Sequence, residues 1–390
     1  MKKTIFEPTM EHNMSGECEM RRSTISKIPR SKRGRSKTLL SKHRYGIEDP
    51  VWQPDNHVGE QTFLEMLSEY ENIDLHLETT FLEGTNGIRV NNSRIEQIGV
   101  IHSSSSTSSH AQWIRIKSFV VDASYEGEIV VASKCSFTYG RESSSKYNES
   151  LGGVTNSSLN SFPIPISPFR SNDSTELLSY VSNNTIRVGH SDKHLMAFSY
   201  RVCITENDFV PYKAPSNYNS EDFELARRLV RSQLDAGEEL TMPWGDLTYH
   251  GFEFLKNRSM KYDACCGESP FGIDAAGLYM NSDGISYAVA SRDERNRIAE
   301  EIQYYVKGLM WFWSSDDSIP ASVRAQVNSK GLCKDEWPEN DHFPPQLYVR
   351  EVRRVRTLFL STPTTKNCLN TYTRTHTGRS YGRRQSIHPE

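Results

Sequence analysis

The sequence predicts an α/β protein, and three features predict it. An apolar run at residues 119–123 is bounded by polar residues, as in a strand covered on both faces of a parallel sheet. Residues 73–77 and 113–117 alternate apolar and polar side chains, as half-buried strands do. Farther along, residues 293–313 repeat their apolar positions with the period of a helix. We expect the three strands to share one region with mixed or parallel pairing.

The remaining elements follow from shorter patterns. Apolar residues recur at helical spacing over residues 63–70, and Ile298, Ile302, Tyr305, Leu309 and Phe312 mark the buried face of the helix at 293–313. A charged helix is predicted at 221–234 and a short one at 321–329, while short strands are predicted at 81–84, 88–90, 94–101 and 197–204. Residues 143–175 are rich in Ser, Asn, Gly and Pro, and they predict a long excursion of the chain.

The 390 residues suffice for more than one domain. We predict a disordered basic leader at 1–48, a first domain at 49–150, a second domain of mixed α+β structure at 151–356, and a disordered basic tail at 357–390. Both ends lack apolar periodicity and are rich in basic and hydroxyl side chains. The net charge of −3 gives no field that favours nucleic acid or a membrane, although the basic leader leaves anionic partners open.

The cysteines predict free thiols. Their number, seven, is odd, they are scattered, and no Cys-x-x-Cys or zinc-like spacing occurs. We expect a reducing compartment, no metal site, and two separate thiols rather than a redox pair at Cys265 and Cys266. No apolar run is long enough to span a bilayer and no secretory signal is seen in the chain as it stands, so we expect a cytoplasmic location.

Short catalytic motifs are missing, but longer blocks are informative. The sequence has no Gly-x-Gly-x-x-Gly, Walker loop or His-Glu-x-x-His. Residues 120–128 are VVDASYEGE, 135–142 are CSFTYGRE, 146–154 are KYNESLGGV and 342–354 are HFPPQLYVREVRR. In order and spacing these blocks resemble the FAD-dependent oxidoreductase family, which shows patterns such as DATYEGDL, YTxGRE and YxESLAGV. The resemblance covers roughly residues 50–356.

The resemblance implies a partial FAD-binding domain of the glutathione-reductase-like class, followed by a substrate domain. It implies FAD as the cofactor, with Asp122, Ala123 and Ser124 at a sharp turn beside it. Phe81 takes the position that meets the adenine, where the family has a small β-branched residue, and Arg141 takes a position near the flavin or the substrate. The alternatives are an ordinary turn after a buried strand for residues 122–124 and a structural salt bridge for Arg141.

Two further residues are candidates for catalysis. His342 suits proton transfer because the pKa of histidine lies near neutrality. Arg350 suits the stabilisation of negative charge or the binding of a carboxylate. A packed histidine and a structural salt bridge are the respective alternatives.

The function expected from the resemblance is hydride transfer from an organic small molecule to flavin. The family begins with a strand, a glycine turn and a helix that bind the pyrophosphate, and the basic leader stands at that place here. Both flanks differ from the family, as in a truncated form, and the retention of FAD is in doubt. The alternative is a non-catalytic remnant or binding module that no longer holds FAD.

Overall fold

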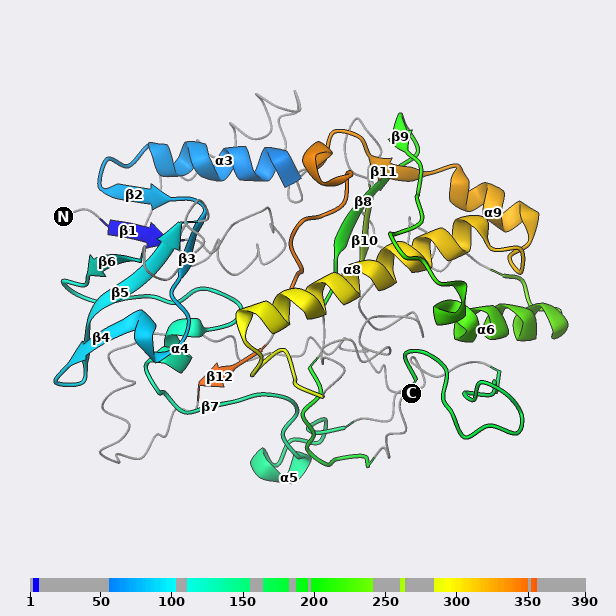
Figure 1. The fold of residues 1–390 in the computed structure, drawn as a ribbon, viewed down its shortest axis with the longest axis horizontal. Helices are drawn as coiled ribbons and strands as arrows, with labels where there is room; N and C mark the ends of the chain where they lie inside the picture. The colour runs from blue at the N-terminus through cyan, green and yellow to red at the C-terminus, as the bar shows by residue number, and fades with distance from the viewer. Residues whose placement is uncertain are drawn as a thin grey trace, which may run out of the picture. The chain divides into compact units, whose positions relative to one another are not determined.

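A computed structural model gives the structure of the chain. It describes residues 3–6, 56–102, 111–154, 164–181, 187–195, 198–240, 260–263, 284–349 and 352–355. The chain forms two compact units, a first unit of residues 1–80 with 139–352 and a second unit of residues 81–138 with 353–390. Figure 1 labels the elements along the chain. Helices and sheets are mixed, in agreement with the predicted α/β class at this coarse level, and the domain borders drawn from the sequence stay a prediction.

The second unit is built on an antiparallel sheet. Its strands are β4 (Ile88–Asn91), β5 (Arg94–His102) and β6 (Gln112–Arg115), with β3 (Thr79–Phe81) beside β5 at the border of the unit. Its other elements are η3 (Thr85–Gly87), α4 (Glu128–Ala132) and the strand pair β7 (Phe137–Thr138) and β12 (Arg354–Val355). Ile98 and Val100 on β5 are buried, as is Val130 on α4, because these apolar side chains leave water together.

The first unit contains a four-stranded sheet in the order β10-β8-β11-β9. The strands are β8 (Arg201–Thr205), β9 (Phe209–Val210), β10 (Met260–Asp263) and β11 (Gly331–Cys333). Val202 and Ile204 on the central strand β8 are fully buried. The predicted strand at 197–204 is therefore confirmed near its C-terminal end, since β8 begins at Arg201.

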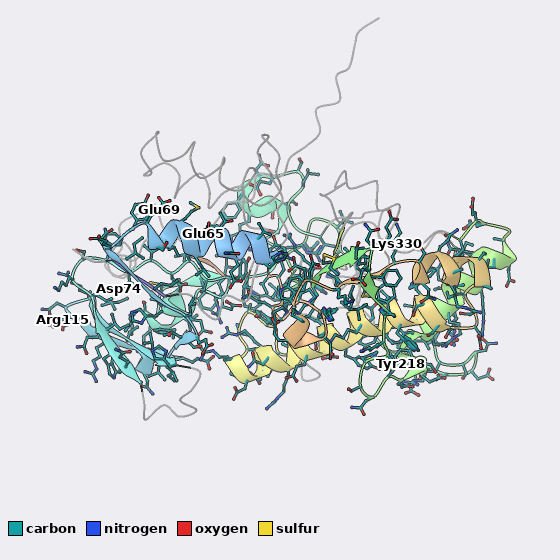
Figure 2. All side chains as sticks on the ribbon, turned by 90° about the horizontal axis from the view of Figure 1, so that it is seen from above. Glu65, Glu69, Asp74, Arg115, Tyr218 and Lys330 are labelled. Atoms are coloured by element: carbon teal, nitrogen blue, oxygen red, sulfur yellow. A yellow bond between two sulfur atoms is a disulfide. The ribbon has the colours of Figure 1, made fainter. Side chains whose placement is uncertain are left out.

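Helix α8 (Arg292–Ser315) is the longest element of the described chain. All five residues predicted for its inner face are buried, and Ser291 and Glu294 form a capping box at its start. The ring of Phe223 packs against Gly308, where a Cβ would lie 2.3 Å from it. Phe223 also stacks on Tyr218, which Figure 2 labels, with ring centroids 5.4 Å apart. The other helices of this unit are α5 (Ser144–Tyr147), η6 (Ser220–Phe223), α6 (Glu224–Asp235), α9 (Ala321–Asn328) and η7 (Pro338–Asn340).

The helix predicted near residues 63–70 is present as α3 (Asn56–Ser68) and begins earlier than expected. Its buried residues are Val58, Gly59 and Thr62, whereas Glu65 is exposed (Figure 2). The chain then turns into β2 (Ile73–His76), close to the strand predicted at 73–77.

The apolar run at residues 119–123 is not a strand, so this prediction is wrong. The segment is a loop, with Phe119 exposed by 64% and Val121 by 55%. It pairs with no strand of the described chain. The Asp122 carboxylate instead accepts the backbone N–H of Ile129 at the start of α4, a local side-chain contact of the kind that competes with strand pairing. The expected shared region also fails, since β2 lies in the first unit and β6 in the second.

The N-terminal leader is not wholly irregular. Lys3–Phe6 form β1, which pairs in parallel with β2 in the register Lys3 to Ile73 and Phe6 to His76. These four residues form a strand within the segment predicted as a disordered leader. A parallel pair requires a crossover connection, and α3 lies within it. The rest of the leader and the tail at 357–390 lie outside the described residues.

Free thiols were predicted throughout, and this is wrong for two cysteines. Cys203 on β8 and Cys333 on β11 form a disulfide, with Cα atoms 5.4 Å apart. The register of the two strands pairs Gly331 with Thr205 and Leu332 with Ile204, so the next pair along is these two cysteines. Cys135 is a buried thiol, and the remaining cysteines lie outside the described residues.

Candidate functional site

The turn at residues 122–124, which was predicted to lie beside the cofactor, caps the start of α4. The Asp122 carboxylate accepts hydrogen bonds from the backbone N–H groups of Ser124 at 3.1 Å and Ile129 at 2.9 Å, and from the Ser124 hydroxyl at 2.6 Å. The Ser124 Oγ in turn accepts the Gly127 N–H at 3.1 Å. Asp122 and Ser124 therefore satisfy the start of α4, whose first N–H groups have no helical partner. Ala123 between them is exposed.

Phe81 ends β3 and is half-buried. Its ring packs over Gly87, where a Cβ would lie 2.6 Å from the ring and 1.8 Å from the Leu82 carbonyl oxygen. The large ring thus fills space above a glycine of the same unit. This is a packing role within the second unit.

Arg141 forms an ion pair in the first unit. Its Nε donates to Asp192 Oδ1 at 2.9 Å and its Nη2 donates to Oδ2. His194 Nδ1 lies 2.8 Å from the same carboxylate. Burial raises the pKa of the Asp192 carboxyl, but the Arg141 hydrogen bonds and positive charge outweigh it and hold the pKa below its usual value. The guanidinium of Arg141 is thus held in an ion pair with Asp192, which is 51 residues farther along the chain.

The Arg141 segment runs against residues 187–195 at very short range. Backbone bonds join Arg141 and Asp192 in both directions, and further bonds join Val154 to Gly189 and His190. Gly140 has a φ of 75° and Gly153 a φ of 78°, a region that glycine enters without a steric cost. The block from residue 139 to 154 therefore needs its glycines for close chain approach.

An alanine at position 140 is expected to lower the free energy of unfolding by about 2–3 kcal/mol, from left-handed strain and overpacking. Its Cβ would lie 2.4 Å from the Asp192 carbonyl oxygen. Gly237→Ala is the control, because Gly237 has a φ of 72° but no atom within 4 Å of a Cβ, and it should cost about 1 kcal/mol. Urea unfolding of both variants measures the difference. Equal costs would mean that the close approach is absent.

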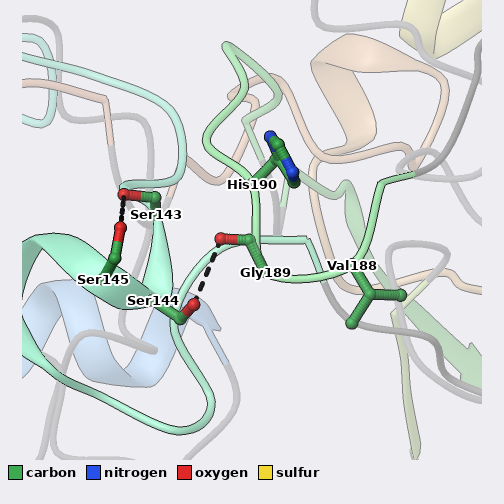
Figure 3. Close-up of a pocket in the computed structure, with 6 residues that line it drawn as sticks. All are labelled: Ser143, Ser144, Ser145, Val188, Gly189 and His190. Atoms are coloured by element: carbon green, nitrogen blue, oxygen red, sulfur yellow. Dashed lines mark hydrogen bonds between the residues drawn. The ribbon is translucent and has the colours of Figure 1, made fainter.

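An open pocket lies where these two segments meet. Its volume is about 250 Å³, and it is lined by Ser143, Ser144, Ser145, Val188, Gly189 and His190 (Figure 3). Ser144 Oγ donates to the Gly189 carbonyl at 3.3 Å, and the Ser143 and Ser145 hydroxyls lie 3.1 Å apart. Hydroxyls and an imidazole suit hydrogen bonding to a polar group. Sequence reasoning missed this pocket, because residues 187–190 are far from the serines along the chain.

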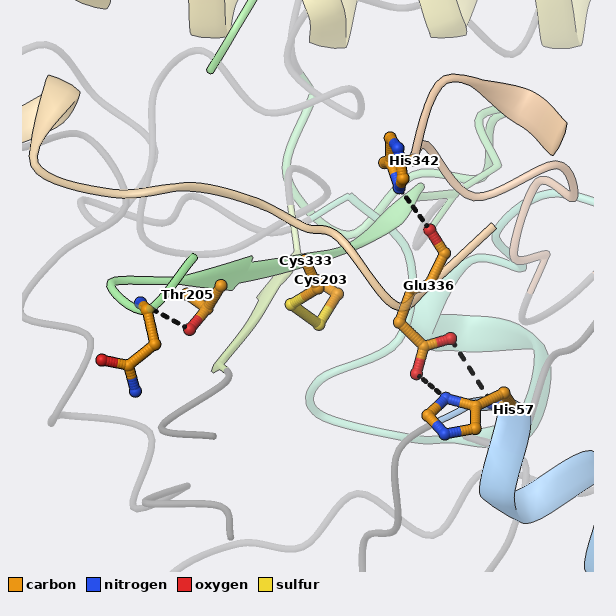
Figure 4. The surroundings of a disulfide bond; sticks show 7 residues. His57, Cys203, Thr205, Cys333, Glu336 and His342 are labelled. Atoms are coloured by element: carbon orange, nitrogen blue, oxygen red, sulfur yellow. Dashed lines mark hydrogen bonds and ion pairs between the residues drawn. A yellow bond between two sulfur atoms is a disulfide. The ribbon is translucent and has the colours of Figure 1, made fainter. Parts of the chain in front are cut away.

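His342 lies in the loop after β11, where its Nδ1 is 3.1 Å from the backbone carbonyl oxygen of Glu336 (Figure 4). The Glu336 side chain, only 2% exposed, contacts His57, whose Nδ1 lies 2.8 Å from Oε1. The backbone N–H of His57 donates to Oε2 at 3.3 Å. Neither Glu336 nor His57 was predicted, because a single acid and a single histidine so far apart in sequence give no signal.

The predicted site residues do not all belong to one unit. Phe81, Asp122, Ala123 and Ser124 lie in the second unit, whereas Arg141 and His342 lie in the first. Arg350 lies outside the described residues. Among the residues that the structure describes, no group of three or more potential ligands could hold a metal ion.

The described residues do not fit the pyrophosphate of a dinucleotide. Asp122 already accepts the Ile129 N–H in α4, and the Ser124 hydroxyl accepts the N–H of the N-cap residue Gly127. Gly140 and Gly153 are used where two chain segments touch. The sequence nowhere supplies the Gly-x-Gly-x-x-Gly turn that would bring backbone N–H groups to the phosphates.

None of the helices in the described part of the chain combines the length and hydropathy needed to cross a bilayer. No curated protein and no solved structure matches the chain. The model of one family does match, over residues 7–374, and its description is FAD dependent oxidoreductase. The resemblance carried by the sequence blocks is confirmed at the level of the family. Because the match spans most of the 390 residues, the chain belongs to the FAD dependent oxidoreductase family.

Proposed function

We propose that this protein is an FAD-dependent oxidoreductase whose reaction transfers a hydride from a small organic molecule to flavin. The observation that carries the proposal is the family match over residues 7–374. The mixed helices and sheets are consistent with it. A glutathione-reductase-like arrangement, with a dinucleotide domain and a substrate domain, remains part of the proposal.

The site residues named from the sequence support this proposal to different degrees. Ala123 supports a close approach of flavin, since it is small and exposed. Asp122, Ser124 and Arg141 have local partners that already account for them. His342 and Arg350 remain proposed for proton transfer and for charge stabilisation.

A cytoplasmic location is also a proposal, and one of the arguments for it no longer holds. It rested partly on free thiols, and the disulfide between Cys203 and Cys333 removes that argument.

A flavin titration tests the proposed function. Fluorescence anisotropy of FAD and of riboflavin is measured as the purified protein is added, up to high concentration. We expect both ligands to gain anisotropy with similar affinities, because the isoalloxazine ring binds while the pyrophosphate has no glycine turn to meet. If neither ligand responds, the chain is a non-catalytic remnant and the proposal is overturned.

A further inference from the structure

The pocket shown in Figure 3 is built entirely within the first unit, and none of the residues proposed for the flavin chemistry lines it. One wall consists of residues 143–145 and the other of residues 188–190. Its volume of about 250 Å³ lies just below the range of about 300 to 1,000 Å³ that is usual for the pockets of drug-sized ligands. The pocket therefore suits a compact molecule.

The two walls are fixed to each other by backbone hydrogen bonds. The Ser144 N–H donates to the Gly189 carbonyl at 3.0 Å, and the Val154 N–H donates to the His190 carbonyl at 2.8 Å. The ion pair of Arg141 ties the same two segments together. Because both walls are already in place, a ligand pays little for ordering them when it binds.

Charge is absent from the lining. Among the residues that the structure describes, no carboxylate, ammonium or guanidinium group lines the pocket. Lys146, which follows the serines, lies with its Nζ 3.4 Å from Glu142 Oε1. Arg187 precedes Val188 in the chain, but it is exposed and is not part of the lining. A charged ligand would meet no opposite charge here, which argues against both an anion and a cation.

The polar groups of the lining include both donors and acceptors. Ser144 Oγ donates its hydrogen to the Gly189 carbonyl, so it can only accept from a ligand. Of the Ser143 and Ser145 hydroxyls, 3.1 Å apart, one donates to the other, and the second keeps its hydrogen for a ligand. A neutral His190 ring adds one donor and one acceptor. Hydroxyl groups match this mixture, because each of them donates and accepts at the same atom.

The apolar side chain of the lining is Val188, which is 62% exposed. The C–H groups of a ligand can contact it. Since the pocket is open, however, a wholly apolar ligand would remove little surface from water and would gain little from binding. A molecule that carries hydroxyls on a small carbon frame satisfies both kinds of contact.

We propose that this pocket is a binding site for a small, neutral polyhydroxy compound. The hydroxyls of the ligand donate to and accept from the three serines and His190, and its C–H groups contact Val188. The inference goes beyond the proposed function, because binding at this pocket requires neither flavin nor hydride transfer.

The test measures binding to the full chain without flavin, by titrations read from saturation-transfer difference NMR. Glycerol and myo-inositol are the neutral polyhydroxy probes. Acetate is the anion, tetramethylammonium the cation, and acetamide a neutral ligand without a hydroxyl. Ser145→Ala and His190→Ala each remove a polar group from the lining. Ser150→Ala is the matched control, because Ser150 is an exposed serine of the same segment that does not line the pocket.

We expect both polyhydroxy compounds to bind saturably, with a Kd in the millimolar range, and more tightly than the other three probes. Ser145→Ala and His190→Ala should each raise this Kd about three- to tenfold, the usual effect of losing one hydrogen bond. Ser150→Ala should leave the Kd unchanged.

An unaltered protein that shows no saturable binding of either polyhydroxy compound would overturn the proposal, and this result depends on no variant. Tighter binding of acetate, tetramethylammonium or acetamide would show that the ligand class is wrong. A Kd that stays the same in Ser145→Ala and His190→Ala, or that rises equally in Ser150→Ala, would place the ligand at another site. Because flavin is absent from these samples, failure of flavin to bind in the titration above would count against the proposed function alone.

Discussion

Replacing both Cys203 and Cys333 by alanine is expected to lower the free energy of unfolding by about 3–5 kcal/mol. The disulfide joins residues 130 apart in sequence, and it therefore restricts the unfolded chain over a long loop. In the loop-entropy description a closure of this length is worth about 5 kcal/mol, and native strain or residual structure reduces it. Because Cys333 is 1% exposed, loss of its sulfur also removes core packing.

Urea unfolding followed by tryptophan fluorescence measures this effect. Trp313 and Trp337 are buried in the unit that contains the disulfide, so their emission reports its unfolding. Dithiothreitol provides the control. It should destabilise the unaltered protein by a similar amount and leave the double variant unchanged. An unaltered protein that is indifferent to reductant would show that the two thiols are not joined.

The helices were predictable where one periodic signal extended over many residues. In α8 the apolar spacing placed Ile298, Ile302 and Phe312 on one face, and all three are fully buried. Short alternating strands such as β2 and β6 were also found, because alternation is a local property.

The predictions failed where one local sequence pattern is compatible with two structures. An apolar run at 119–123 suits a buried strand, but a strand requires a partner, and partners are not visible in a single segment. In the structure the run is a loop, and Asp122 accepts the backbone N–H of Ile129 at the start of α4. The same carboxylate was predicted from the sequence to lie beside the cofactor. In the structure it caps the start of α4.

The contacts of the candidate site were beyond sequence reasoning for a similar reason. Glu336 and His57 are 279 residues apart, and Cys203 and Cys333 are 130 apart. Only the folded chain brings such pairs together. His342 was named from the sequence for proton transfer, and this stays a prediction; in the structure its Nδ1 lies 3.1 Å from the backbone carbonyl oxygen of Glu336.

The chain with this sequence, once purified, is expected not to retain FAD. The pyrophosphate carries two negative charges, and in dinucleotide folds it is held by a glycine turn at a helix N-terminus. Glycine is required there because a Cβ would keep the backbone from the phosphates. This sequence has no such turn, and the polar candidates Asp122 and Ser124 bind backbone N–H groups at the start of α4 instead. The loss should amount to several kcal/mol, at about 1.4 kcal/mol for each tenfold change in affinity.

The measurement that tests this account most directly is the visible absorbance spectrum of the protein after incubation with FAD and desalting. A member of this family that lacks the pyrophosphate turn should emerge colourless, with the flavin left in the small-molecule fraction. The matched sample is the same protein and FAD before desalting, in which the free flavin band is present. A stoichiometric flavin band that stays with the desalted protein would contradict the account, because it would show that this chain holds the dinucleotide without a glycine turn.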